Sequence, residues 1–156
     1  MKELSTQSCG IKKIMDNKLD ILYENNLVAS IINLNDVEEG LSFFTHDEAN
    51  IQFGTWNYKK GKELEPHFHN KFDRNATITQ EAVFVLKGKV QCDLYNKKGQ
   101  FISSHVLENN DLMIQFNEVH KYIMLEDSIV LEFKNGPYFG PEIDRTRIET
   151  DENKSI

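Results

Sequence analysis

From Leu41 to Gly136 the sequence repeats one pattern, in which short apolar runs alternate with polar turns. The runs are rich in β-branched and aromatic residues, and the breaks include KKGQ (97–100) and ENND (108–111). Many short strands at regular spacing are typical of a β-sandwich or β-barrel, so the pattern predicts an all-β fold. The expected strands are 41–46, 50–59, 63–69, 80–88, 89–96, 101–107, 111–116, 120–125 and 129–136.

The first forty residues carry a different pattern. The stretch 11–26 places apolar side chains at 11, 14, 15, 19 and 22, which suits an amphipathic helix, although its ILY triplet can also begin a strand. The stretch 27–34 has the composition of a strand. We therefore expect a helical or extended segment over 1–40 that packs on the barrel or on a dimer partner, a barrel over 41–148 and a flexible tail over 149–156.

Length, charge and cysteine content narrow the class of protein. A chain of 156 residues is most simply one domain. Its net charge of −7, from 25 acidic and 18 basic residues, disfavours binding to nucleic acid and to anionic membranes. No apolar run is long enough to span a bilayer, and the N-terminus lacks a hydrophobic signal region. Two cysteines without CxxC spacing make no disulfide framework, so we expect a cytoplasmic protein.

Three of the five histidines, with one glutamate, predict a metal site. His67 and His69 are one residue apart, and on a strand such residues project from the same face. Glu81 begins another expected strand, and His120 stands near the start of a third. Three imidazoles and a carboxylate suit one divalent ion, with Zn²⁺, Fe²⁺, Mn²⁺ and Ni²⁺ not distinguished. The alternative is a polar cavity without metal, in which the histidines bond to one another or to water.

The spacing of these residues resembles the first motif of the cupins. Gly61, five residues and His67-Phe68-His69 match its front half, and Glu81, six residues and Gly88 match its back half. Eleven residues separate the two halves, where the family has three or four. This departure predicts an enlarged loop between two strands, and its residues 70–79 can act as a lid.

The second cupin motif is only partly kept. Asn109, Gln115 and Asn117 stand where that motif has glycine, proline and glycine, while His120 keeps its histidine. The resemblance implies a single cupin barrel, which is a jelly roll or double-stranded β-helix. It also implies His67, His69, Glu81 and His120 as metal ligands, with Glu81 as a catalytic acid or base if it is not a ligand.

A narrower resemblance lies at the C-terminal end. The stretch VLEFKNGPYFGPEIDRTRI (130–148) is similar to the WbuC-type cupins, which are encoded among bacterial polysaccharide-biosynthesis genes. This likeness implies a homodimer that binds or acts on a sugar or nucleotide sugar in surface polysaccharide biosynthesis. A metal-dependent isomerase or epimerase, a metal-free nucleotide-sugar isomerase or epimerase, a dioxygenase and a non-catalytic binding protein all remain open.

Three further residues are candidates for ligand binding. Trp56 and Tyr58 lie on the expected strand before the two histidines, and an aromatic face can stack on a sugar or base. Arg74 lies in the enlarged loop, where its guanidinium is suited to a phosphate or carboxylate. The opposing interpretation is that both aromatic residues pack in the core and that Arg74 is an exposed loop residue.

Overall fold

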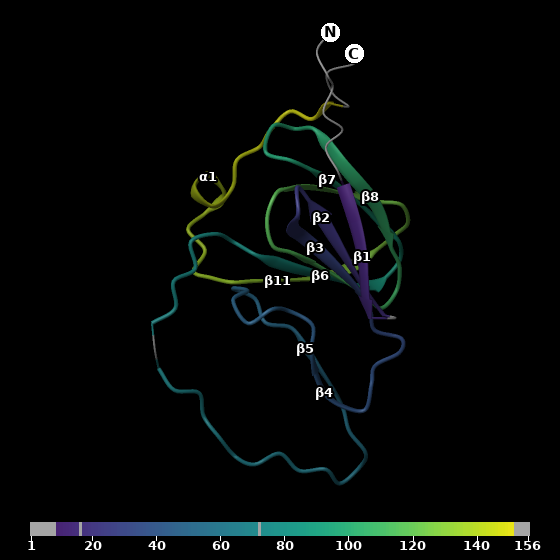
Figure 1. Ribbon diagram of the computed structural model, residues 1–156, viewed down its shortest axis with the longest axis vertical. Helices are drawn as coiled ribbons and strands as arrows, with labels where there is room; N and C mark the ends of the chain where they lie inside the picture. The colour runs from purple at the N-terminus through teal and green to yellow at the C-terminus, as the bar shows by residue number, and fades with distance from the viewer. Residues whose placement is uncertain (1–8, 16, 72, 152–156) are drawn as a thin grey trace.

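The computed structural model describes residues 9–15, 17–71 and 73–151, in which three antiparallel sheets confirm the all-β class (Figure 1). The largest sheet has six strands and combines the N-terminal segment with strands from the rest of the chain. In sheet order its strands are β1 (Cys9–Met15), β2 (Lys18–Tyr23), β3 (Asn26–Asn33), β9 (Asp111–Gln115), β6 (Glu81–Lys87) and β11 (Ile129–Lys134).

The two smaller sheets lie on either face of the large one. In sheet order the three-stranded sheet consists of β10 (Val119–Met124), β7 (Val90–Tyr95) and β8 (Phe101–Leu107). The two-stranded sheet consists of β4 (Gly40–Phe43) and β5 (Gly54–Asn57), and a short helix, α1 (Pro141–Asp144), follows β11. Among the described residues, no helix combines the length and apolar character needed to cross a membrane.

Two apolar clusters hold these layers together. The first fills the space between the six-stranded and three-stranded sheets and includes Ile21, Val85, Leu94 and Met113. The second lies on the opposite face of the six-stranded sheet, where Ile114 packs with side chains that flank β4 and β5. Met113 and Ile114 are neighbours in β9 and belong to different clusters, as the alternation of side chains along a strand requires. The six-stranded sheet is therefore the middle layer.

The helical interpretation of 11–26 is wrong, and the extended one is right. Strands β1 and β2 occupy this stretch as an antiparallel hairpin, with residue 16 outside the described part. Ile21 is fully buried and pairs with Ile11 on one side and with Ala29 of β3 on the other. Sheet partners on both sides satisfy the backbone of β2, so tertiary pairing overrides a local spacing that also suits a helix.

The expected strand at 63–69 is also wrong. No strand occurs between β5 and β6 in the described residues 58–71 and 73–80, which form one long connection. Figure 1 shows that this connection extends away from the sheets. Phe68 is 84% exposed, and Pro66 has no N–H to donate to a neighbouring strand. The segment has the residue spacing of a strand, but in the described residues no neighbouring strand pairs with it.

The chain ends extend past the described part of the structure. Residues 1–8 of the predicted N-terminal segment and residues 152–156 of the predicted tail lie outside it. Residues 149–151 pack on the turn between β7 and β8, where the Asp151 N–H donates to the carbonyl of Gly99 over 3.0 Å. The structure contains one chain, so the homodimer stays a prediction.

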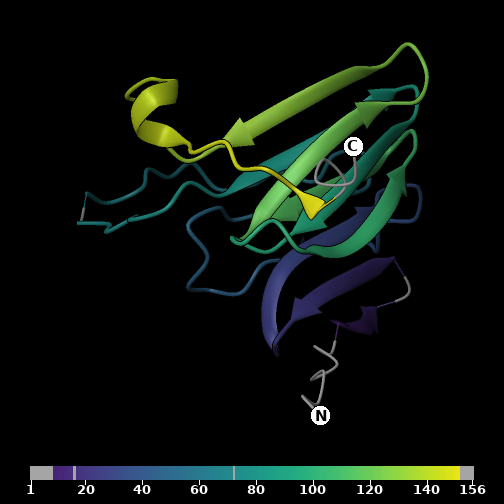
Figure 2. The same cartoon turned by 90° about the horizontal axis from the view of Figure 1, so that it is seen from above.

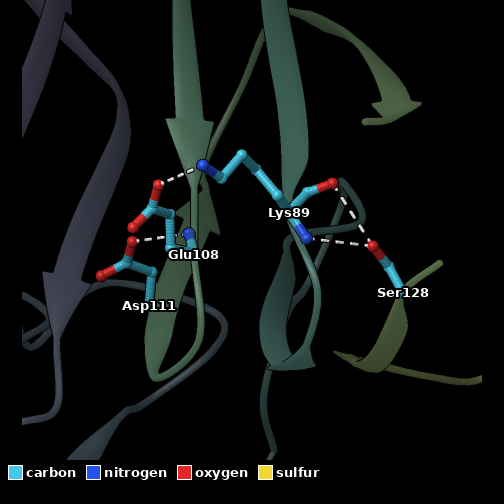
Figure 3. A network of polar contacts seen from close by, with 4 residues as sticks. All are labelled: Lys89, Glu108, Asp111 and Ser128. Atoms are coloured by element: carbon cyan, nitrogen blue, oxygen red, sulfur yellow. Dashed lines mark hydrogen bonds and ion pairs between the residues drawn. The ribbon is translucent and has the colours of Figure 1, made fainter. Parts of the chain in front are cut away.

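The turn between β6 and β7 is fixed by a polar network at the end of β6 that lies away from Glu81 (Figure 3). Lys89 Nζ lies 2.8 Å from Glu108 Oε1, and the Lys89 N–H donates to Ser128 Oγ over 3.1 Å. Asp111 Oδ2 accepts the Glu108 N–H over 2.8 Å. Three turns that are distant in sequence are thereby joined at one end of the molecule.

Candidate functional site

The structure brings Glu81 and His120 together across the two facing sheets. Glu81 is the first residue of β6 in the six-stranded sheet, and His120 is the second residue of β10 in the three-stranded sheet. His120 Nε2 lies 2.9 Å from Glu81 Oε1, and their side chains are 36% and 17% exposed. Because an ionised carboxylate only accepts hydrogen bonds, the imidazole N–H donates to Glu81. The pair is partly buried and still open to a ligand.

Glu81 is positioned by the buried residue before it. The Gln80 N–H donates to Asn135 Oδ1 over 2.7 Å, and Gln80 Oε1 accepts the Asn50 N–H over 2.8 Å. These bonds tie the start of β6 to the end of β11 and to the chain that precedes β5. Glu81 then pairs in register with Gln115 of β9 and Lys134 of β11. The carboxylate of Glu81 therefore lies at a strand end that these hydrogen bonds hold in place.

A large pocket opens beside this pair. Its volume is about 1040 Å³, at the upper end of what small-molecule sites offer. Its walls come from the ends of β6, β9, β10 and β11, from the connection before β6 and from the C-terminal segment. Polar side chains that line it include Thr77, Thr79, Glu81, Gln115, Asn117, His120, Lys134 and Asn135.

Gln115 lines this pocket and has a buried polar atom without a partner in the described chain. Its side-chain amide donates to the Tyr122 hydroxyl over 2.8 Å, and the residue is only 4% exposed. Its Oε1 has no hydrogen-bond partner among the described residues. A buried polar atom left unpaired costs about 1–3 kcal/mol, so such an atom beside a pocket is suited to bind a polar ligand group.

The protonation states in the site follow from burial and neighbouring charge. Burial alone raises the pKa of Glu81, but the hydrogen bond and charge of His120, together with Lys134, outweigh it, and this pKa lies below its ordinary value. Burial, with Cys92 and Glu81 nearby, raises the pKa of the Tyr122 phenol. Burial also raises the pKa of the Cys92 thiol to about 12. At neutral pH Glu81 is thus a carboxylate, while Tyr122 and Cys92, which contact Gln115 and do not line the pocket, are a neutral phenol and an unreactive thiol.

The C-terminal segment forms the rim of the pocket and is held at two points. At one point Thr79 Oγ1 donates to Asp144 Oδ1 of α1 over 2.8 Å. At the other, residues 149–151 pass so close to Gly99 that a Cβ there would overlap the Glu149 carbonyl oxygen. Figure 2 shows α1, in yellow, beyond the strand ends, with the chain returning from it toward the sheets. Arg145 and Arg147 line the pocket from between these two points.

His67 and His69 lie apart from this pocket, on the long connection before β6. Their ring centroids are 5.4 Å apart, and His67 Nδ1 contacts the Glu65 carbonyl at 2.9 Å. Both residues are exposed, and neither is among the residues that line the pocket. The four predicted ligands thus form two pairs, His67 with His69 and Glu81 with His120.

This arrangement does not fit a four-ligand metal centre. Within residues 17–71 and 73–151, no group of three or more histidine, cysteine, aspartate or glutamate side chains is placed to hold a metal ion. Protein sites for Zn²⁺ and related ions usually supply at least three ligands. Metal binding therefore stays a prediction, and no chemical step is derived through a metal.

The three other predicted ligand-binding residues lie elsewhere on the surface. Trp56 on β5 is 67% exposed, and Tyr58 just beyond that strand lies beneath Lys62 Nζ, 5.8 Å from its ring centroid. Arg74 lies in the connection before β6. None of the three is among the described residues that line the pocket.

Sequence reasoning missed Gln115, Tyr122, Arg145 and Arg147. Tyr122 carried a usable signal, because it is two residues after His120 and thus on the same face of β10. Gln115 carried one as well, as a polar residue at the end of the apolar run DLMIQ. No local signal points to Arg145 and Arg147, because their place depends on how the C-terminal segment folds back.

Comparison with known proteins adds nothing to these observations. No family model, no curated protein and no solved structure matches the chain.

Proposed function

We propose that this protein has the cupin type of jelly roll and binds a sugar or nucleotide sugar in the pocket beside Glu81 and His120. We further propose that these two residues move a proton on the bound molecule, as in a metal-free isomerase or epimerase. One observation carries the proposal: an imidazole and a carboxylate in contact at 2.9 Å, from two facing sheets, beside a pocket of about 1040 Å³.

The chemistry follows from the hydrogen bond. Because His120 Nε2–H donates to Glu81, the neutral imidazole has its basic lone pair on Nδ1. The carboxylate stabilises the imidazolium that forms when Nδ1 takes a proton. Histidine in this role contributes about 10²- to 10⁴-fold to a proton transfer. The unpaired Oε1 of Gln115 is suited to accept a hydrogen bond from a hydroxyl of the same ligand.

The proposal is tested by solvent exchange. The protein is incubated in D₂O with a panel of free sugars, sugar phosphates and nucleotide sugars, and NMR follows deuterium entering C–H positions beside a carbonyl. We expect one class to exchange, and His120→Asn to slow that exchange by about 10²-fold or more. The matched control is His105→Asn, because His105 is a part-buried histidine of β8 outside the pocket lining.

Three outcomes separate the alternatives. Exchange that is lost in His120→Asn and kept in His105→Asn supports the proposal. Binding of a panel compound without exchange favours the non-catalytic binding protein. Exchange that is unaffected by His120→Asn contradicts the assigned role of this histidine.

A metal-dependent form of the same function is the second candidate. It is favoured by the side-by-side imidazoles of His67 and His69, a pair of nitrogen donors suited to a divalent ion. For this candidate we expect elemental analysis of the purified protein to find one metal ion per chain. That ion should be lost in His67→Ala/His69→Ala and kept in His105→Asn. A metal-free protein with an intact fold would exclude this candidate and leave the first one standing.

A further inference from the structure

The charged side chains of the pocket are unusual for this chain. The protein as a whole has a net charge of −7, yet its pocket is lined by more cationic than acidic side chains. The cationic ones are Lys97, Lys121, Lys134, Arg145 and Arg147, and the acidic ones are Glu81, Glu118, Glu132 and Asp144. Cations gathered in one concave site of an acidic protein favour an anionic ligand there.

The acidic groups of the pocket already have partners in the chain. Glu81 contacts His120, and Glu132 Oε1 lies 3.3 Å from Lys134 Nζ. Glu118 Oε2 accepts the Lys97 N–H over 2.9 Å, and Asp144 accepts the Thr79 hydroxyl. Their negative charge is thus at least partly offset within the protein.

Unlike these acidic groups, the guanidinium groups of Arg145 and Arg147 lack partners among the described residues. Neither has an ion pair or hydrogen bond with any other described residue. Both are exposed side chains on the rim of the pocket. Among the described residues, these two arginines thus lie beside the same pocket without side-chain partners and can donate to a ligand.

The segment that carries these two arginines is held in place by contacts on both sides of them. The chain leaves α1 in an extended conformation at Arg145, with φ −144° and ψ 150°, and both arginines line the pocket. The segment is anchored before Arg145 by the Asp144–Thr79 bond and after Arg147 by the contact with Gly99. A planar guanidinium binds phosphate oxygens in pairs, so two such groups on an anchored segment match a phosphate or diphosphate.

A second observation points to a ligand in the same pocket. Gln115 is buried and lines the pocket, and its Oε1 is without a partner in the described chain. A ligand with a hydroxyl group near Gln115 and an anionic group near the rim would pair with Gln115 Oε1 and with the two guanidinium groups. A phosphorylated sugar has both kinds of group.

We propose that the ligand of this pocket carries a phosphate or diphosphate and that Arg145 and Arg147 bind it. This inference rests on the proposed function for the location of the ligand and is independent of the proton transfer by Glu81 and His120. The shared chemistry is the phosphate group, which a sugar phosphate and a nucleoside diphosphate sugar both supply.

Calorimetric titration of the full chain with inorganic pyrophosphate, a hexose phosphate and uridine diphosphate tests the inference. We expect saturable binding of at least one probe, weakened roughly ten- to hundredfold in Arg145→Gln/Arg147→Gln. Tighter binding of uridine diphosphate than of the other two identifies a nucleotide ligand, and tighter binding of the hexose phosphate identifies a sugar phosphate. The control Lys87→Gln removes an exposed positive charge outside the pocket lining and should leave the affinity unchanged.

The competing outcomes are distinct. Absence of binding by all three probes, or equal binding by wild type and the folded double variant, overturns the inference. Arg145→Lys/Arg147→Lys keeps the charge without the paired donors, so intermediate affinity supports binding through both guanidiniums. Phosphate binding that persists while exchange is absent contradicts the proposed proton transfer alone, and exchange with uncharged sugars only contradicts the phosphate inference alone.

Discussion

Replacing Glu81 by glutamine and His120 by asparagine in one chain is expected to slow proton exchange into the bound sugar no further than either replacement alone. Each single variant should lose about 10²- to 10⁴-fold, because the carboxylate acts through the imidazole that it contacts at 2.9 Å. Groups that work as one unit have strongly non-additive effects. The exchange rate is measured by NMR in D₂O on the panel compound that exchanges fastest.

The control for this pair is Glu118→Gln, which removes a carboxylate from the same pocket lining. Glu118 accepts a hydrogen bond from the backbone of Lys97, so its loss should leave the exchange rate within about threefold of wild type, as expected for removal of a mostly structural contact. If the losses from Glu81→Gln and His120→Asn multiply in the double variant, the two residues act independently and the proposed pair is wrong.

Replacing Gly88 by alanine is expected to lower the free energy of unfolding by about 3 kcal/mol. Gly88 has φ +93°, where a side chain is strained, and a Cβ there would overlap Ser128 Oγ and lie 2.7 Å from the Asp127 carbonyl oxygen. Ser128 also belongs to the network that joins three turns (Figure 3). The midpoint of thermal unfolding should fall by roughly 10 °C, as calorimetry or circular dichroism can measure.

Gly61→Ala separates the two causes of this effect. Gly61 has a similar φ of +90°, but nothing lies within 4 Å of the position that its Cβ would occupy. It should therefore lose only the backbone contribution, about 1 kcal/mol. If both alanine variants lose the same free energy of unfolding, the close approach of Ser128 to Gly88 does not contribute to the effect.

Most strands could be predicted from the sequence, because their pattern is local. Strand β8, at Phe101–Leu107, coincides with the expected 101–107; β9 ends one residue earlier than expected, and β10 begins and ends one residue earlier. Here alternating burial and turn residues agree over the same short window. Over 11–26 two local patterns competed, and the pairing of β2 with β1 and β3 decided between them.

The segment around His67 and His69 shows where local pattern fails. The spacing of these histidines agrees with a strand, but a strand also needs a neighbour with which to exchange backbone hydrogen bonds. The chain from 58 to 80 is long enough to leave the sheets, and in the described part of it no such neighbour exists. The predicted ligand set was thereby divided into two pairs.

Within the site, the alternation of side chains along β6 already placed Glu81 on the same face as Val85, which packs in the first apolar cluster. That much is a property of a strand with period two, and the sequence alone determined it, together with the all-β class and most strand limits. The sequence also predicted Glu81 and His120 in one site; the separation of His67 and His69 from them and the return of Arg145 and Arg147 to the pocket came from the tertiary structure alone. The physical reason is the same for each. These features depend on which segments distant in sequence pair or pack together, and many contacts in the two apolar clusters contribute to the stability of that arrangement.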